Sequence, residues 1–177
     1  MTLTKNMFMR HLTFITGGQR SGKSSFAQKL AEKATDCPVY LATARIWDED
    51  FEKRIIRHKS DRGKQWQTIE EEKELGKLKL EGKTVVLDCI TLWLTNISHD
   101  FNFDIEMSLD YAKGQWQQFI NQDFNLIIVS NELGMGVHPE HEVARKFADL
   151  QGWMNQFIAI STDEAYLMVS GIPLKIK

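Results

Sequence analysis

The sequence has little cysteine and proline, and it lacks both a long apolar run and an excess of basic charge. Its 177 residues include 2 Cys and 3 Pro. Cys37 and Cys89 show no metal-ligand spacing, so we expect buried free thiols rather than a disulfide framework or a zinc site. No apolar run reaches the length of about 18 residues that a transmembrane helix needs. The formal charge of -2 excludes a globally basic surface for nucleic acid.

The overall composition is that of a soluble globular chain. Hydrophobic residues make up 42% and charged residues 26%, which is typical of a packed domain. Residues 1–10 form an N-terminal extension without the apolar core of a secretory signal, so we expect a cytoplasmic protein. Residues 11–177 are predicted to form a single domain, because neither a linker nor an internal repeat interrupts them.

Apolar periodicity predicts strands that alternate with helices along most of the chain. The predicted strands are 11–16, 39–42, 84–87 and 125–130, and a hairpin pairs 165–169 with 174–176. The predicted helices are 23–34, 48–59, 70–80, 104–119 and 139–159. This alternation predicts an α/β fold with a mostly parallel sheet, helices on both faces and an antiparallel C-terminal hairpin at one edge.

A phosphate-binding loop is predicted between the first strand and the first helix. The motif G-x-x-x-x-G-K-[ST] is matched by Gly17, Gly18, Gln19, Arg20, Ser21, Gly22, Lys23 and Ser24. In such a loop the backbone N–H groups face phosphate oxygens, and the following helix N-terminus adds positive potential. Lys23 is the expected contact for the β- and γ-phosphates, and the Ser24 hydroxyl is the expected Mg²⁺ ligand. The sequence therefore predicts a RecA-like P-loop nucleotide-binding domain with catalytic function.

A second Mg²⁺ ligand is expected from a neighbouring strand, and Asp88 is the candidate. It directly follows the apolar run 85–87. P-loop enzymes hold the cation through the loop hydroxyl and an aspartate of this kind. The alternative is an aspartate that only forms a turn after the strand.

The predicted helix 48–59 carries a candidate nucleophile. Phe51, Ile55 and His58 recur at helical spacing, and Arg54 and Arg62 flank the histidine at intervals of four residues. Neighbouring cations disfavour the imidazolium form, and a neutral imidazole is competent to attack phosphorus. From the residues alone, a solvated charged helix with His58 at the border of its apolar stripe is the alternative.

Further segments follow the loop in a specific order. They are YLATA at 40–44, RIIRHKSDR at 54–62, LDCIT at 87–91 and SNELGMG at 130–136. With the loop, this set resembles the bifunctional adenosylcobinamide kinase / adenosylcobinamide-phosphate guanylyltransferase family of cobalamin biosynthesis. The sequence departs from some members at Arg57, where they carry a second histidine, and at Asp88, where they carry glutamate.

The resemblance implies two reactions. ATP or GTP phosphorylates adenosylcobinamide, and GTP then gives GMP to the resulting adenosylcobinamide phosphate with release of pyrophosphate. His58 would carry the GMP, and Lys23 would serve the triphosphate. By the same mapping, the nucleotide-binding residues beyond the loop are Thr43, Lys59, Ser60, Asp61, Arg62, Glu70 and Asp88. The resemblance also implies a homo-oligomer, specifically a homotrimer.

Two other functions remain open at this point. One is a small-molecule kinase in which His58 is inert, and the other is a nucleotide-binding regulatory module without catalysis. Glu132, which follows the strand 125–130, is either a base or substrate contact or a residue that fixes the glycine-rich loop after it. The 5 Trp are expected in the core or at an interface more than on a corrinoid-binding surface.

Overall fold

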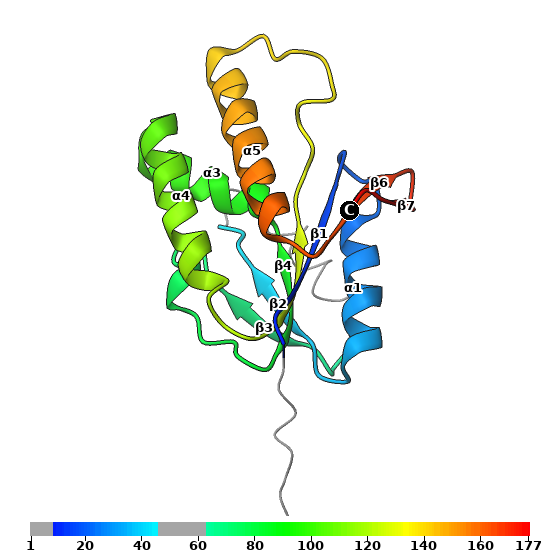
Figure 1. The fold of residues 1–177 in the computed structure, drawn as a ribbon. Helices are drawn as coiled ribbons and strands as arrows, with labels where there is room; N and C mark the ends of the chain where they lie inside the picture. Colours follow the sequence, from blue (N-terminus) through cyan, green and yellow to red (C-terminus); the bar gives the residue numbers. More distant parts are fainter. Residues whose placement is uncertain (1–8, 46–62) are drawn as a thin grey trace, which may run out of the picture.

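The computed structural model describes residues 9–45 and 63–177, and within them seven strands form one sheet (Figure 1). The strands are β1 (His11–Gly17), β2 (Val39–Ala42), β3 (Gln67–Glu70), β4 (Thr84–Asp88), β5 (Asn125–Val129), β6 (Glu164–Val169) and β7 (Ile172–Lys175). Their order is β3-β2-β4-β5-β1-β6-β7. Only the β6–β7 pair is antiparallel. The expected mostly parallel sheet with a C-terminal edge hairpin is therefore confirmed.

Helices cover both faces of this sheet, as predicted. They are α1 (Lys23–Ala34), α3 (Ile90–Asp100), α4 (Ile105–Phe119), α5 (Glu142–Ser161) and the 3₁₀ turn η1 (Leu75–Lys77). In Figure 1, α1 lies on one face and α3, α4 and α5 lie on the other. Successive side chains of a strand point to opposite faces. Ile15 therefore belongs to the apolar cluster under α1, whereas Leu12 and Phe14 belong to the larger core under the other three helices. None of the helices in residues 9–45 and 63–177 has the length and apolar character of a membrane-spanning segment.

Two of the tryptophans belong to the larger core. Trp93 and Trp116 are fully buried there, and each large apolar side chain buried in this way contributes about 1.5–3 kcal/mol. Trp66 is only partly buried, and Trp153 on α5 is 48% exposed. The prediction that tryptophans lie in the core is thus confirmed for Trp93 and Trp116.

The predicted helix over 70–80 is wrong. β3 occupies 67–70, and the chain then turns on Glu71, whose Oε1 accepts the N–H groups of Lys73 and Glu74 at 2.9 and 2.8 Å. Later amides of the segment donate to glutamine side chains of α4 and of the loop after it. These contacts bury Leu75 and Leu80 in the core. Long-range hydrogen bonds and burial therefore override the helix propensity of a Glu- and Lys-rich segment.

Two other helices differ from the prediction. α3 is absent from the predicted elements, although Ile90, Trp93, Leu94 and Ile97 have the spacing of a buried helix face. α5 begins at Glu142 rather than at 139.

The two thiols differ as well. Cys89 is buried as expected, but Cys37 is exposed. The expectation of a buried thiol is therefore wrong for Cys37, which precedes a proline in the turn between α1 and β2.

Candidate functional site

The loop between β1 and α1 has a conformation that requires glycine at two positions. Gly17 has φ 150°, and a Cβ placed there would lie 2.5 Å from the carbonyl oxygen of Met168 on β6. Gly22, the N-cap of α1, has φ 95°, a left-handed conformation that side chains disfavour. The order of strand, loop and helix is the context that a P-loop needs.

Lys23 is the first residue of α1, and its ammonium group lies inside the loop. Nζ donates to the carbonyl oxygens of Gly17 at 3.0 Å and Gly18 at 2.7 Å. Burial lowers the pKa of Lys23, and the nearby Asp88 carboxylate opposes this shift. α1 has neither an acidic residue in its first turn nor a side-chain cap. Its N-terminal N–H groups and dipole therefore suit an anion.

The remaining loop residues occupy two environments. Gly18, Gln19 and Arg20 are exposed, Ser21 is buried, and Ser24 is half-buried in the first turn of α1. Their contacts with a nucleotide remain predictions.

The C-terminal hairpin packs against the loop. The N–H group of Gly171, at the tip between β6 and β7, donates to the carbonyl oxygen of Ser21 at 2.9 Å. A Cβ placed at Gly22 would lie 3.2 Å from the Cα atom of Gly171. The sequence does not reveal this contact, because the β1–β6 pairing that creates it joins distant parts of the chain.

Asp88 lies at the carboxyl end of β4, and β5 separates its strand from β1. Its Oδ2 accepts a hydrogen bond from the Tyr40 hydroxyl at 3.0 Å. The Thr43 hydroxyl donates to the carbonyl oxygen of Cys89 at 2.8 Å and accepts from its N–H group at 2.9 Å. Thr43 therefore fixes the backbone beside Asp88, while its predicted nucleotide contact remains a prediction. Burial raises the pKa of the Cys89 thiol to about 12, so this thiol stays neutral and is no nucleophile at pH 7.

Beyond β5 the chain runs beside β1 as far as the loop. The N–H groups of Ser130 and Glu132 donate to the carbonyl oxygens of Ile15 and Gly17, each at 2.9 Å. The Glu132 carboxylate accepts the N–H group of Gly134 at 2.8 Å. This geometry favours the interpretation of Glu132 as a residue that fixes the glycine-rich loop.

Three neutral side chains, Ser130, Gln151 and Asn155, form what we call the Asn155 network. Asn155 Oδ1 accepts from Ser130 Oγ at 2.6 Å and from Gln151 Nε2 at 3.0 Å. Its Nδ2 donates to the carbonyl oxygen of Asn131 at 3.1 Å. All three side chains are buried. The network therefore holds α5 against the end of β5, next to the loop.

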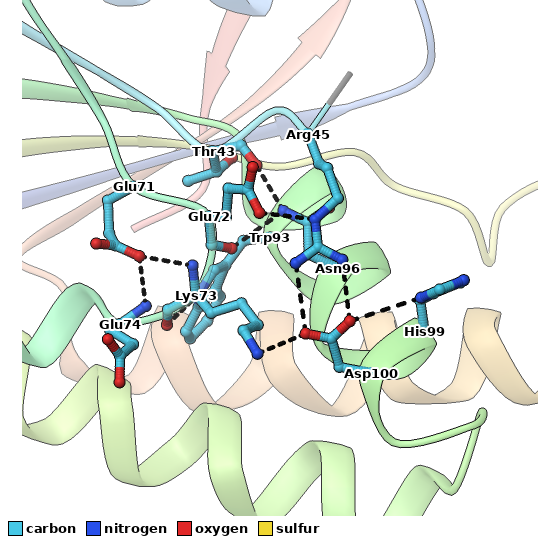
Figure 2. Close-up of polar contacts among 10 residues, drawn as sticks. All are labelled: Thr43, Arg45, Glu71, Glu72, Lys73, Glu74, Trp93, Asn96, His99 and Asp100. Carbon is cyan, nitrogen blue, oxygen red and sulfur yellow. Dashed lines mark hydrogen bonds and ion pairs between the residues drawn. The ribbon is translucent and has the colours of Figure 1, made fainter. Parts of the chain in front are cut away.

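Four charged side chains, Arg45, Glu72, Lys73 and Asp100, form what we call the Asp100 cluster (Figure 2). Arg45 Nε donates to Glu72 at 2.6 Å, and its Nη1 donates to Asp100 at 2.9 Å. Lys73 Nζ lies 2.5 Å from Asp100. The buried side chain of Asn96 on α3 donates to the carbonyl oxygen of Thr43 at 2.7 Å and to that of Glu72 at 3.0 Å. The cluster and Asn96 fasten α3 to the end of β2 and to the turn after β3.

Glu70 is not brought to the P-loop by the fold. It ends β3, which lies four strand positions from β1, so roughly 19 Å separates the two at about 4.8 Å per strand. A single phosphate group cannot bridge them. The predicted site residues that fall outside the described residues are His58, Lys59, Ser60, Asp61 and Arg62, together with the predicted helix 48–59.

The loop geometry places the chain among the P-loop nucleotide-binding proteins. A family model described as "Cobinamide kinase / cobinamide phosphate guanyltransferase" matches residues 13–176. The bifunctional adenosylcobalamin biosynthesis protein CobU of Escherichia coli (strain K12) is 33% identical over 182 residues, which cover 94% of this chain and 99% of the relative. The bifunctional protein CobP of Pseudomonas aeruginosa is 36% identical over 168 residues, which cover 92% and 95%. The chain therefore belongs to this family of transferases, as its ordered motifs predict.

A solved structure is also similar. The flagellar accessory protein FlaH from Methanocaldococcus jannaschii aligns with a TM-score of 0.46 and 15% identity, which covers 96% of this chain and 80% of FlaH. The assignment of the P-loop fold rests on the strand order and loop of the chain itself.

Proposed function

We propose that the chain phosphorylates adenosylcobinamide with ATP or GTP and then transfers GMP from GTP to adenosylcobinamide phosphate. Family membership supports the substrates and the reaction class. The observation that carries the proposal is Lys23 at the start of α1, at the sheet edge where β4 ends in Asp88. Carboxyl ends of parallel strands share one edge, which is where α/β proteins bind ligands.

In the kinase step, a hydroxyl oxygen of adenosylcobinamide attacks the γ-phosphorus, and the bond from this phosphorus to the bridging oxygen breaks. The nucleoside diphosphate leaves, and the hydroxyl proton passes to solvent. When the nucleotide binds, Lys23 Nζ donates to phosphate oxygens in place of the carbonyl oxygens of Gly17 and Gly18. Together with the α1 dipole, its charge stabilises the negative charge on the transferred group.

The donor set at this edge fits Mg²⁺. The ion prefers oxygen ligands and is held by one or two protein oxygens together with phosphates and water. Ser24 would supply a hydroxyl and Asp88 a carboxylate. No described residue donates a hydrogen bond to Oδ1 of Asp88, which leaves this oxygen for a cation. When bound, Mg²⁺ neutralises phosphate charge.

In the guanylyl step, an imidazole nitrogen of His58 attacks the α-phosphorus of GTP and pyrophosphate leaves. A phosphate oxygen of adenosylcobinamide phosphate then attacks the same phosphorus. The phosphorus–nitrogen bond breaks, which regenerates His58 and gives adenosylcobinamide-GDP. We assign the GTP contacts of this step to Lys59, Ser60, Asp61, Arg62 and Glu70.

We also propose that the active form is a cytoplasmic homotrimer built on the single domain 11–177. The apolar side chains of Trp153 and Ile160 on α5, and of Ile172 and Leu174 on β7, are exposed. Contacts between subunits would cover these side chains, and large exposed apolar patches commonly mark such contacts.

The test is covalent labelling with GTP that carries ³²P at the α-phosphorus. Wild type and His58→Ala are incubated with Mg²⁺, denatured and analysed on a gel, and the acid stability of the label is measured. His11→Ala is the matched control, because His11 lies at the opposite end of β1 from the loop.

We expect an acid-labile label on wild type and on His11→Ala, and none on His58→Ala. Adenosylcobinamide phosphate should discharge the label as adenosylcobinamide-GDP. A wild-type protein that binds GTP and phosphorylates adenosylcobinamide without becoming labelled would leave the small-molecule kinase as its function. GTP binding without turnover of either corrinoid would leave the regulatory module.

A further inference from the structure

Tyr40 is a buried tyrosine whose hydroxyl group meets the candidate Mg²⁺ ligand. Its side chain is 8% exposed, and the hydroxyl donates to Oδ2 of Asp88 at 3.0 Å. A buried hydroxyl needs a hydrogen-bond partner. When that partner is a carboxylate at a nucleotide site, the hydrogen bond also orients the carboxylate.

Strand register explains how the tyrosine reaches this carboxylate. Tyr40 lies opposite Val86 in the parallel β2–β4 pair, and Asp88 lies two residues beyond Val86. Residues two apart in a strand share a face and are about 6.6 Å apart. A tyrosine side chain that leans along the strand spans this distance, so its hydroxyl arrives at the carboxyl edge of the sheet.

The ring of Tyr40 is itself held in place. Trp66 packs against it edge-on, with ring centroids 6.4 Å apart and an interplanar angle of 76°. The Trp66 indole N–H group donates to Glu32 on α1 at 2.9 Å. Tyr40 also belongs to the apolar cluster under α1, with Val86 and Ala31. A hydroxyl on a fixed ring is a directional donor, and its hydrogen bond restricts rotation of the Asp88 carboxylate.

We propose that Tyr40 is a positioning residue that orients the Asp88 carboxylate for Mg²⁺. This inference rests on the proposed function, which assigns the cation to Ser24 and Asp88. The hydroxyl occupies Oδ2 and leaves Oδ1 as the oxygen for the cation. Removal of an outer hydrogen-bond partner commonly weakens metal binding 10–100-fold. Because one ligand of several is affected, we expect a loss near the lower limit, about tenfold.

The test measures how strongly Mg²⁺ and nucleotide favour each other's binding. Isothermal titration calorimetry gives the Kd of α,β-methylene GTP in Mg²⁺ and in EDTA, and the ratio of the two values is the coupling. This analogue lacks the α–β bridging oxygen, so His58 cannot be guanylylated during the titration. The variants are Tyr40→Phe, Asp88→Asn and the double variant.

Tyr166→Phe is the matched control. The Tyr166 hydroxyl also donates to a carboxylate, that of Glu164, at 3.1 Å. Its ring likewise packs against α1, through Phe26. The same atom is removed, but no candidate metal ligand loses a partner.

We expect Tyr40→Phe to reduce the coupling about tenfold while the Kd in EDTA stays at the wild-type value. Asp88→Asn should remove most of the coupling, and Tyr40→Phe should add nothing on that background. Tyr166→Phe should behave as wild type. A coupling in Tyr40→Phe within about twofold of wild type, or an equal loss of affinity in EDTA and Mg²⁺, overturns the inference. If Asp88→Asn also leaves the coupling unchanged, the Mg²⁺ assignment in the proposed function fails as well.

Discussion

The Asn155 network and the Asp100 cluster both hold a helix against the sheet, the first through neutral side chains and the second through charged ones. Each fastens a helix to the carboxyl edge of the sheet, α5 at the end of β5 and α3 at the end of β2. The Asn155 network is neutral, and its side chains are at most 8% exposed. The Asp100 cluster is charged, and its side chains are 24% to 47% exposed.

Burial, rather than charge, decides which of the two contributes more to stability. A buried polar group that loses its partner costs about 1–3 kcal/mol, because water cannot replace the lost hydrogen bond. An exposed ion pair contributes only about 0.2–1 kcal/mol, because water and salt screen it and two long side chains lose freedom. The Asp100 cluster therefore contributes less free energy than the Asn155 network, although its contacts are charged.

The largest effect is expected for Asn155→Ala. The substitution removes the acceptor for Ser130 and Gln151 and the donor to the carbonyl oxygen of Asn131, all beside the loop. We expect a loss of about 3 kcal/mol in the free energy of unfolding, from several unsatisfied groups. Urea unfolding at equilibrium measures this loss.

Asn121→Ala serves as the control for that substitution, because Asn121 is an exposed asparagine after α4. It should change stability by less than about 0.5 kcal/mol. If the two variants unfold at the same urea concentration, the ranking of the two networks is wrong.

A smaller loss of stability is expected for Asn96→Ala, which separates the contribution of a buried amide from that of the neighbouring ion pairs in the Asp100 cluster. Asn96 is fully buried beneath the Asp100 cluster and donates to the carbonyl oxygens of Thr43 and Glu72. Its own Oδ1 is buried and has no hydrogen-bond partner among the described residues, so the substitution also removes one unfavourable group. We expect a loss of about 1.5 kcal/mol, measured in urea at low and high salt. A loss that falls with salt would mean that the ion pairs, not the amide, hold α3.

Local patterns predict the parts of the site that are continuous in sequence. Residues 17–24 carry their own motif, and the helix over 23–34 and the strand before it have clear apolar periodicity. The apolar run 85–87 places Asp88 at the end of a strand, which is the position that makes it a candidate Mg²⁺ ligand. The position of the phosphate-binding loop between strand and helix was therefore predictable without a structure.

Contacts between distant segments are what the sequence leaves undetermined. Tyr40 meets Asp88 only because β2 pairs with β4 in one register, and Ser130 meets Asn155 only because α5 returns over β5. The short strand β3 lacks a strong apolar pattern, and most of it is exposed. The segment after it has helix propensity, but burial of Leu75 prevents a helix. The distance of Glu70 from the loop depends on the same strand order.

The smallest effect is expected for Asp100→Asn, which removes the charge at the centre of the Asp100 cluster. Because the pairs with Arg45 and Lys73 lie at the surface, we expect a loss of about 0.5–1 kcal/mol at low salt. At about 1 M salt the Debye length falls to about 3 Å, and the difference from wild type should nearly vanish. A difference that persists in high salt would mean that the pair behaves as a buried one.

The pH dependence of this difference provides an independent test of the same charge. Arg45 and Lys73 hold the pKa of the Asp100 carboxyl well below its usual range, so the ionised form is favoured in the folded protein. The stabilisation is therefore fully present above the unfolded-state pKa of about 4, begins to decrease below it, and is lost only as the pH falls through the lower pKa of the folded protein. Urea midpoints of wild type and Asp100→Asn should stay apart between about pH 8 and pH 5 and should draw together only as the pH falls below about 4. Convergence on the alkaline side instead would assign the effect to another group, because Asp100 has already lost its proton there.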